Sequence, residues 1–222
     1  MHDATDSTER RAWLSGGTSA DPIYAMVRRA LVDRSVESGA LLDIGCGHGR
    51  LLSYVRDRVT RYAGADVVRY PEFPSEAEFI RIDLDTGRVP LDAAAVDIVA
   101  AVETIEHLEN PRAFMREVTR LCRPGGWMIV TTPNQLSFLS KLTLVIKNKF
   151  NAFTDSSYPA HLTALLEVDL RRIAAECGWA DVAILFSEHG RMPGTARSWP
   201  AFLSRLLPRA LSDNVCVIGR KA

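Results

Sequence analysis

The chain has 222 residues, of which 47% are hydrophobic and 24% charged, a balance typical of one globular domain with a full core. Lysine plus arginine and aspartate plus glutamate both number 27, so the chain lacks the basic excess that a nucleic-acid partner usually requires. The four cysteines are far apart and have no metal-ligand spacing, which indicates free thiols in a reducing cytosol.

The amino-terminal residues are polar and contain no apolar run, so we expect no secretory signal there. We interpret residues 1–20 as a flexible segment and residues 21–222 as a single domain. The longest apolar stretch, Leu136–Ile146, is interrupted by Lys141 and is shorter than the roughly 20 residues that a transmembrane helix needs. We therefore expect a cytoplasmic protein.

The first elements in the chain alternate between helix and strand. A helix is expected over residues 22–36, with Asp21 as its N-cap and a proline at its first position. A strand over Ala40–Ile44 then leads through a glycine-rich turn into a helix over residues 50–58. Three further strands follow, over Tyr62–Val67, Glu78–Ile82 and Val96–Val102.

The second half of the chain continues this alternation. Pro111 opens a helix to about Leu121, and a breaker cluster at residues 123–126 follows it. A later helix over residues 162–177 ends at Gly178, a residue type common just after a helix. The remaining strands are expected over Trp127–Thr132, Asp181–Phe186 and Asn214–Ile218.

Two stretches interrupt the pattern and are predicted to be lid-like inserts. Residues 133–160 are apolar-rich without a clear period, and residues 187–212 contain one short helix near residues 201–207. The alternation predicts an α/β fold, with a seven-stranded, mostly parallel sheet and helices on both faces. The long connection before Asn214 predicts an antiparallel last strand.

A glycine-rich loop, Asp43-Ile44-Gly45-Cys46-Gly47-His48-Gly49, runs from the first strand directly into a helix. Glycines at alternate positions let the backbone turn sharply and let a ligand approach where a Cβ would block it. The helix amino terminus offers free N–H groups to an anion or carboxylate. Dinucleotide folds place a third glycine three residues after the second, where this chain has Arg50, and this disfavours a nicotinamide cofactor.

Acidic residues end the next two strands. Asp66 lies 17 residues beyond Gly49, where a carboxylate can accept both hydroxyls of a ribose. Asp83 ends the third strand, where it can accept a hydrogen bond from an adenine amino group while Leu84 covers the ring. Each Asp by itself is a common loop or cap residue, but three strand ends in register rarely carry the needed groups by chance.

From about Ala40 to Ile218 the chain resembles the class I S-adenosylmethionine-dependent methyltransferases. The resemblance rests on the glycine loop, on Asp66, on Asp83-Leu84, and on the stretch from Asp97-Ile98-Val99 to Leu121-Cys122-Arg123-Pro124-Gly125-Gly126. That stretch is similar to the family's fourth strand, helix and L-x-P-G-G turn. The resemblance implies a Rossmann-like fold and S-adenosylmethionine as cofactor.

The resemblance also implies which residues bind the cofactor. Asp43 and the glycine-loop backbone would hold the methionine end, and Asp66 would hold the ribose. Asp83 and Leu84 would hold adenine, and Glu103 would lie beside the sulfonium. The predicted cofactor-binding set is Asp43, Gly45, Cys46, Gly47, Gly49, Asp66, Val67, Asp83, Leu84 and Glu103.

Residues 102–108 follow the fourth strand and read Val-Glu-Thr-Ile-Glu-His-Leu, which brings two carboxylates and an imidazole to the edge of the sheet where α/β ligands bind. They resemble the E-x-x-E-H segment of methyltransferases that O-methylate ubiquinone precursors. In part of that group these residues hold a divalent cation, which would orient a bound hydroxyl and lower its pKa.

Related enzymes carry a similar segment without a metal, and there the histidine is a general base or lines the pocket while one acid caps a helix. We predict His107 and Glu106 as catalytic residues without a metal. The alternative is Mg²⁺ held by Glu103, Glu106 and His107.

Two further polar residues are predicted on the acceptor side. Asn134 follows the fifth strand and could hydrogen-bond an acceptor hydroxyl, although a polar turn residue after a proline is the common alternative. His161 begins a segment that looks like the one before the last long helix in polysaccharide-cluster and quinone-type methyltransferases, which would bring it over the pocket.

These features predict methyl transfer to an oxygen of a small-molecule acceptor. A phenolic or quinone-like ring and a sugar hydroxyl both fit. The alternative functions are a catalytically silent cofactor-binding scaffold or regulatory subunit, and a nicotinamide dehydrogenase. Four arginines among apolar residues in the insert at 187–212 suit a membrane surface, an anionic substrate, or a partly packed insert with solvated charges. The oligomeric state stays open.

Overall fold

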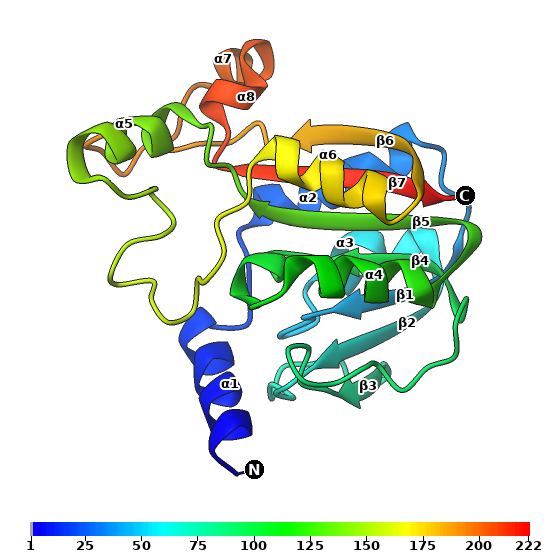
Figure 1. Cartoon of the computed structure of the whole chain (residues 1–222). Helices are drawn as coiled ribbons and strands as arrows, with labels where there is room; N and C mark the ends of the chain where they lie inside the picture. Colours follow the sequence, from blue (N-terminus) through cyan, green and yellow to red (C-terminus); the bar gives the residue numbers. More distant parts are fainter. Residues whose placement is uncertain (1) are drawn as a thin grey trace.

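A computed structural model describes residues 8–222 in full and residues 2–7 as backbone. One twisted sheet crosses the molecule and helices cover both of its faces (Figure 1). The sheet has seven strands in the order β3-β2-β1-β4-β5-β7-β6. The strands are β1 Gly39–Ile44, β2 Val59–Asp66, β3 Glu78–Arg81, β4 Val96–Ala101, β5 Cys122–Pro133, β6 Trp179–Phe186 and β7 Asn214–Lys221.

The pairing confirms the predicted topology. Strand β1 pairs in parallel with β2 and β4, β2 with β3, and β4 with β5. Strand β7 is antiparallel to both of its neighbours, β5 and β6. The carboxyl ends of β1, β2 and β4 therefore meet at one edge, where the loops that follow them converge.

The helices pack on the two faces of the sheet because β1 is buried on both sides. Leu42 and Ile44 pack in one apolar cluster with α4 and α6, whereas Leu41 packs in the other with α2 and α3. The helices are α1 His2–Ser15, α2 Asp21–Asp33, α3 Leu51–Val55, α4 Pro111–Leu121, α5 Phe138–Lys147, α6 Glu167–Glu176, α7 Ala201–Leu206 and α8 Pro208–Leu211, with 3₁₀ turns η1 Arg56–Arg58 and η2 Ile105–His107.

Three local predictions need correction. Asp21 is the first residue of α2 and not its N-cap, which is Ala20, and the Asp21 carboxylate pairs with Arg50 at 2.6 Å. The breaker cluster at residues 123–126 lies within β5, next to a register irregularity against β4. Helix α6 begins at Glu167, five residues later than expected, because the preceding residues bond to η2 instead.

The amino-terminal segment differs most from its prediction. Residues 1–20 were expected to be flexible, whereas residues 2–15 form α1. Tertiary contacts hold this helix. Arg11 pairs with Asp85 at 2.7 Å, Tyr70 donates its hydroxyl to the Ala12 carbonyl at 2.6 Å, and the Trp13 ring lies 4.9 Å from the ring of Tyr70.

The two predicted inserts contain short helices on the side of the molecule where β1, β2 and β4 end (Figure 1). Helix α5 lies in the first insert, and α7 and α8 lie in the second, with α5 in contact with α8. Among residues 2–222, no helix combines the length and the hydrophobicity needed to span a membrane.

Candidate active site

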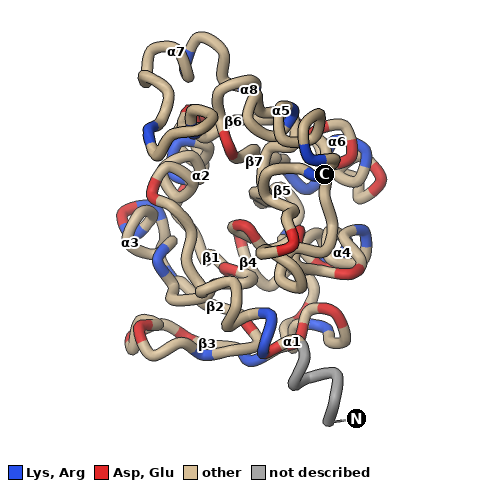
Figure 2. The backbone as a smooth tube through the Cα atoms, turned by 90° about the vertical axis from the view of Figure 1, so that its left-hand side faces the viewer, with Lys and Arg blue, Asp and Glu red and all other residues tan. Residues whose placement is uncertain are grey.

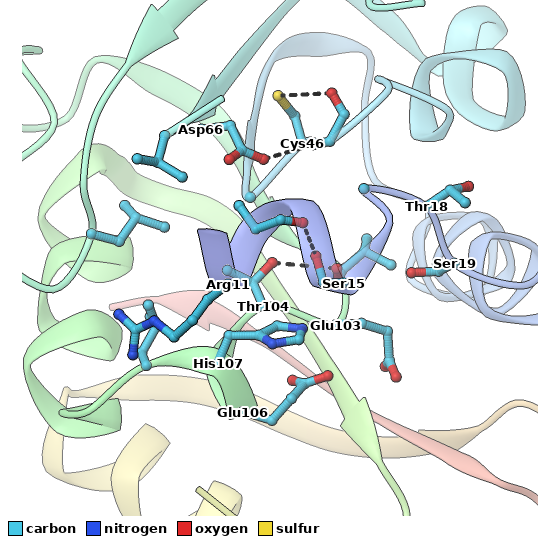
Figure 3. A pocket seen from close by; sticks show the side chains of 18 of the residues that line it. Arg11, Ser15, Thr18, Ser19, Cys46, Asp66, Glu103, Thr104, Glu106 and His107 are labelled. Carbon is cyan, nitrogen blue, oxygen red and sulfur yellow. Dashed lines mark hydrogen bonds between the residues drawn. The ribbon is translucent and has the colours of Figure 1, made fainter. Parts of the chain in front are cut away.

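A cavity of about 260 Å³ opens at the carboxyl edge of β1, β2 and β4. Figure 2 views the molecule from this side, and Figure 3 shows the cavity from close by. Asp66 and Cys46 lie on one side of the cavity, and Glu106 and His107 lie on the other (Figure 3). Helix α1 covers part of the cavity and contributes Arg11 to its lining.

The glycine loop has the backbone that only glycine adopts readily. Gly45 and Gly47 have φ of +73° and +50° and both line the cavity. A Cβ on Gly45 would lie 2.2 Å from the Thr104 hydroxyl, and one on Gly47 would lie 2.0 Å from the Gly17 carbonyl oxygen. Neighbouring atoms therefore already fill the space that a side chain would need.

Gly49 is constrained by packing. Its φ is +72°, it does not line the cavity, and a Cβ there would meet Pro74 at 2.6 Å. This glycine allows the start of the following helix to pack against Pro74 and its neighbour Phe73. Its contact with the cofactor stays a prediction.

Asp66 ties the glycine loop to the end of β2. It is 9% exposed and lines the cavity, together with Val67. Its Oδ2 accepts a hydrogen bond from the Gly47 amide at 2.8 Å, and its Oδ1 accepts one from the Val68 amide at 3.3 Å. Burial raises the pKa of Asp66, although these amides favour the ionised form.

Asp43 is a second buried acid in the lining. The Tyr62 hydroxyl donates to its Oδ2 at 2.6 Å, while its Oδ1 has no hydrogen-bond partner among the described residues. Burial raises the pKa of Asp43 to about 7. Cys46 also lines the cavity, and burial raises the pKa of its thiol, so this sulfur is protonated at neutral pH.

Only one residue of the predicted adenine-binding pair lies at the cavity. Leu84 lines it, but Asp83 does not, and Asp83 Oδ1 instead accepts a hydrogen bond from the Asp85 amide at 3.0 Å. Asp85 takes the position in the lining, with its carboxylate paired to Arg11 and bonded to the Glu109 amide at 2.9 Å. The negative charge of Asp85 is thus already neutralised by Arg11 of α1.

Glu103 lies just beyond β4 in a left-handed conformation, with φ of +51°. Its Oε1 accepts from the Thr131 hydroxyl at 2.8 Å, and its Oε2 accepts from the Asn214 amide at 2.7 Å. Burial and the nearby Glu106 raise the pKa of Glu103 well above its usual range. Both oxygens are held in place, so the carboxyl faces the cavity in one orientation.

Glu106 is fully buried, yet neither of its carboxyl oxygens has a hydrogen-bond partner among the described residues. Burial raises its pKa to about 8, so the group is mostly protonated at neutral pH. Its backbone oxygen accepts from the amides of Leu162 and Thr163, at 2.9 and 3.0 Å. These bonds bring the chain around His161 against η2, although the two segments are far apart in sequence.

His107 and His161 meet at the acceptor side of the cavity. Their ring centroids are 4.9 Å apart in an edge-to-face arrangement. His107 Nδ1 lies 2.7 Å from the Ala160 carbonyl oxygen, and His161 Nδ1 lies 2.7 Å from that of Ala152. A nitrogen that faces a carbonyl must carry the proton, so in each neutral ring Nε2 is the free acceptor. Burial lowers the pKa of both imidazoles.

Glu106, His107 and His161 each offer a ligand atom, and these atoms lie within 4.8 Å of one another. The predicted metal alternative named Glu103 in place of His161, but Thr131 and Asn214 already engage both oxygens of Glu103. One carboxylate and two imidazoles suit a transition metal or zinc better than Mg²⁺, which prefers oxygen ligands.

Asn134 does not line the cavity, and its contact with an acceptor stays a prediction. Its amide nitrogen donates to the carbonyls of Arg209 and Ser212, at 2.8 and 2.9 Å, and its Oδ1 accepts from the Leu136 amide at 3.0 Å. These hydrogen bonds engage both ends of the side-chain amide and join the two inserts at the end of β5.

Several lining residues come from α1 and the turn that follows it, which the sequence analysis did not connect with the site. Arg11, Ser15 and Gly17 belong to this group. Tyr70, from the loop after β2, also lines the cavity, and its ring stacks on His48 at 4.5 Å. The sequence does contain a signal for helix α1, because Gly16-Gly17 follows a run without glycine. Glycines with positive φ, as both have here, commonly end a helix.

Residues 21–184 match a family model described as a methyltransferase domain. The chain is 34% identical over 130 residues to a Mycolicibacterium smegmatis protein named "Probable S-adenosylmethionine-dependent methyltransferase", covering 57% of this chain and 49% of that protein. It is 30% identical over 121 residues to a Maricaulis maris protein named ubiquinone biosynthesis O-methyltransferase, covering 51% of this chain and 48% of that one. The chain thus spans about half the length of these curated relatives.

Among solved structures, the fold is similar to that of a crystal structure of a SAM-dependent methyltransferase from Archaeoglobus fulgidus. The TM-score is 0.64 at 18% sequence identity, and the match covers 89% of this chain and 94% of that chain. The likeness therefore concerns most of the chain.

Proposed function

This chain belongs to the class I S-adenosylmethionine-dependent methyltransferase family, and from that premise we propose that it transfers a methyl group to an oxygen of a small-molecule acceptor. A phenolic or quinone-like hydroxyl is the acceptor favoured here over a sugar hydroxyl. Support comes from the named function of the relative from Maricaulis maris and from the two free Nε2 atoms at the acceptor side.

The observation that carries the proposal is the set of buried carboxyls in the cavity. Five carboxyls line it: Asp85 is paired with Arg11, and burial raises the pKa of the other four, Asp43, Asp66, Glu103 and Glu106. Buried acids that face one another in this way are best neutralised by a cationic ligand. S-adenosylmethionine carries a sulfonium and an ammonium group, so its charge fits this lining.

The chain's own residues divide between the parts of the cofactor. The cavity-lining Gly45 and Gly47 and the unpartnered Oδ1 of Asp43 fit the methionine end, and Asp66 retains lone pairs for ribose hydroxyls. Leu84 fits the adenine face. When bound, S-adenosylmethionine supplies an activated methyl group, so alignment with the acceptor oxygen provides much of the rate.

His107 takes the acceptor's proton in this proposal. Its Nδ1 proton is held by the Ala160 carbonyl, which fixes the ring and leaves Nε2 as the unprotonated nitrogen of the neutral ring. Its lowered pKa keeps the ring neutral at pH 7, as a base requires. Glu106, protonated below its pKa of about 8, can donate a hydrogen bond to the acceptor.

Calorimetry and a methyl-transfer assay test the proposal. We expect the purified protein to bind S-adenosylmethionine and not NAD, and to methylate a catechol-type acceptor faster than a sugar. Cofactor binding with no transfer to either class would favour the silent scaffold. Binding of NAD alone would overturn the assignment of the cavity.

A metal-assisted variant of this function is a second candidate, because Glu106, His107 and His161 form a possible ligand set. EDTA distinguishes the two. We expect activity to survive EDTA, because the sulfonium already activates the methyl group and its transfer depends mainly on alignment. Loss of activity that Zn²⁺ or Mn²⁺ restores would instead assign these three residues to a metal.

A further inference from the structure

Helix α5 presents its apolar residues to solvent. The only residue that it buries is Ser140, while Phe138, Leu144, Val145 and Ile146 are 48%, 38%, 81% and 68% exposed. A helix of a soluble domain normally does the opposite and turns its apolar face to the core. The sequence pattern of α5 is therefore suited to a partner outside this chain.

Helix α7 likewise exposes its apolar residues to solvent. It buries only Ser204, while Phe202 and Leu206 are 68% and 72% exposed, and Leu207 just after the helix is 53% exposed. The two inserts lie together, since the ring of Phe138 is 6.2 Å from that of Trp199 and α5 contacts α8. Both project on the same side of the molecule (Figure 1). We call these seven exposed apolar residues the outer face: Phe138, Leu144, Val145, Ile146, Phe202, Leu206 and Leu207.

Cations predominate around the outer face. The two inserts, residues 133–160 and 187–212, together contain seven lysines and arginines and two acids, Asp155 and Glu188. The rest of this neutral chain consequently carries a net charge of −5. Lys149, Arg191, Arg205 and Arg209 form exposed ion pairs, which solvent largely screens. Lys141 and Lys147 are on α5 itself, and neither forms an ion pair with any described residue. The basic residues are thus concentrated where the apolar residues are exposed.

We propose that the outer face docks on the surface of an anionic phospholipid bilayer. Apolar side chains of interfacial helices bury themselves at the boundary between headgroups and acyl chains, and lysines and arginines around them attract lipid phosphates. The charge complementarity is to phosphate, because cations outnumber acids seven to two in the inserts. A protein interface normally has a polar rim with charges of both signs, and two projecting helices offer no groove for a peptide.

The cavity is connected to this surface through the segment after α5. The Ala152 carbonyl accepts from His161 Nδ1, and the ring of Phe153 lies 5.3 Å from that of His161. Docking of α5 would therefore bring the acceptor side close to the bilayer, where an apolar, membrane-dissolved acceptor could enter. This last step rests on the proposed function, whereas vesicle binding itself does not.

Cosedimentation with vesicles tests the proposal without cofactor or acceptor. The full chain should bind vesicles of three parts phosphatidylcholine to one part phosphatidylglycerol, bind pure phosphatidylcholine weakly, and dissociate as salt is raised. Val145→Glu combined with Ile146→Glu should lower the partition coefficient at least tenfold. Lys141→Gln combined with Lys147→Gln should lower it roughly fivefold for each lysine removed.

Matched controls keep the test specific. Val32→Glu changes a 40% exposed valine on α2, and Arg56→Gln with Arg61→Gln removes two exposed charges near β2. These controls should bind vesicles like the parent protein, and thermal unfolding should show that all variants are folded. No binding to anionic vesicles, or equal losses in the controls, overturns the proposal. A dimer that Val145→Glu dissociates would likewise overturn it, because a second copy would then be the occupant.

Discussion

At the scale of single residues, the acids of the cavity differ from surface acids because they are protonated in the folded protein at a pH where they would ionise in the unfolded chain. Glu106 is the extreme case, with no partner for either oxygen among the described residues. Such a group makes folding depend on pH, since the two states hold different numbers of protons.

Glu106→Gln should therefore flatten the pH dependence of stability. The folded pKa of Glu106 is about 8 against an ordinary value of 4.5, so the folded state holds the extra proton between these values. Stability is largest at the acidic end of this window and falls as pH rises through it, by on the order of 3–5 kcal/mol for this group. Denaturant unfolding of the ligand-free protein at pH 5.5 and 8.5 measures the effect. Identical pH slopes in the two proteins would contradict the assignment.

His107→Ala tests the base. We expect turnover to fall roughly 10²–10⁴-fold with little change in cofactor affinity. Because burial lowers the pKa of His107, the parent enzyme should keep its activity below pH 6.5 and lose it only when the ring becomes protonated. His189→Ala, an exposed histidine outside the cavity, is the control and should leave turnover unchanged. If both variants stay fully active, His107 has no role in proton transfer.

At the scale of elements, the strands and the glycine loop could be predicted because their signals are local. Hydrophobic periodicity identified all seven strands, and Gly45, Gly47 and Asp66 follow from what a turn and a strand end need. Helix α1 was missed because its stability comes from Tyr70 and Asp85, which are distant in sequence. The contacts of Asn134 could not be predicted for the same reason, since its partners Arg209 and Ser212 lie in another insert.

Arg11→Ala should loosen α1 and weaken cofactor binding. The Arg11–Asp85 pair is largely buried, with side chains 13% and 9% exposed, so the loss leaves an unpaired acid beside the cavity. We expect the dissociation constant for S-adenosylmethionine to rise roughly tenfold, which is about 1.4 kcal/mol. Arg10→Ala on the same helix is the matched control, because Arg10 is exposed. Equal affinities in the two variants would mean that α1 does not contribute to binding.

At the scale of the whole molecule, charged groups are unevenly distributed although the net charge is zero. Acids with raised pKa gather at the cavity, and an excess of cations gathers on the two inserts. The sequence could show that residues 187–212 are rich in arginine, but only the packing of α5 against α8 shows that the two inserts lie together.

The affinity for a cation in the cavity should rise with pH. Asp43 and Glu106 lose their protons as pH passes about 7 and about 8, and the ionised forms attract a sulfonium. S-adenosylhomocysteine has the same ammonium but no sulfonium charge. We expect the preference for S-adenosylmethionine over S-adenosylhomocysteine to grow by roughly tenfold between pH 6 and pH 8.5, as measured by calorimetry. If the preference does not change with pH, the charge of these carboxyls does not contribute to binding of the sulfonium.

The packing of α1 brings the fluorescent side chain of Trp13 next to Tyr70, a residue that lines the cavity. The indole of Trp13 lies edge-on to Tyr70, and Tyr70 lines the cavity that α1 partly covers. Any movement of this helix changes what surrounds the indole, and with it the colour and intensity of its emission. Rapid-mixing fluorescence of a variant that keeps Trp13 and replaces the other three tryptophans would therefore report any movement of this helix when the cofactor binds.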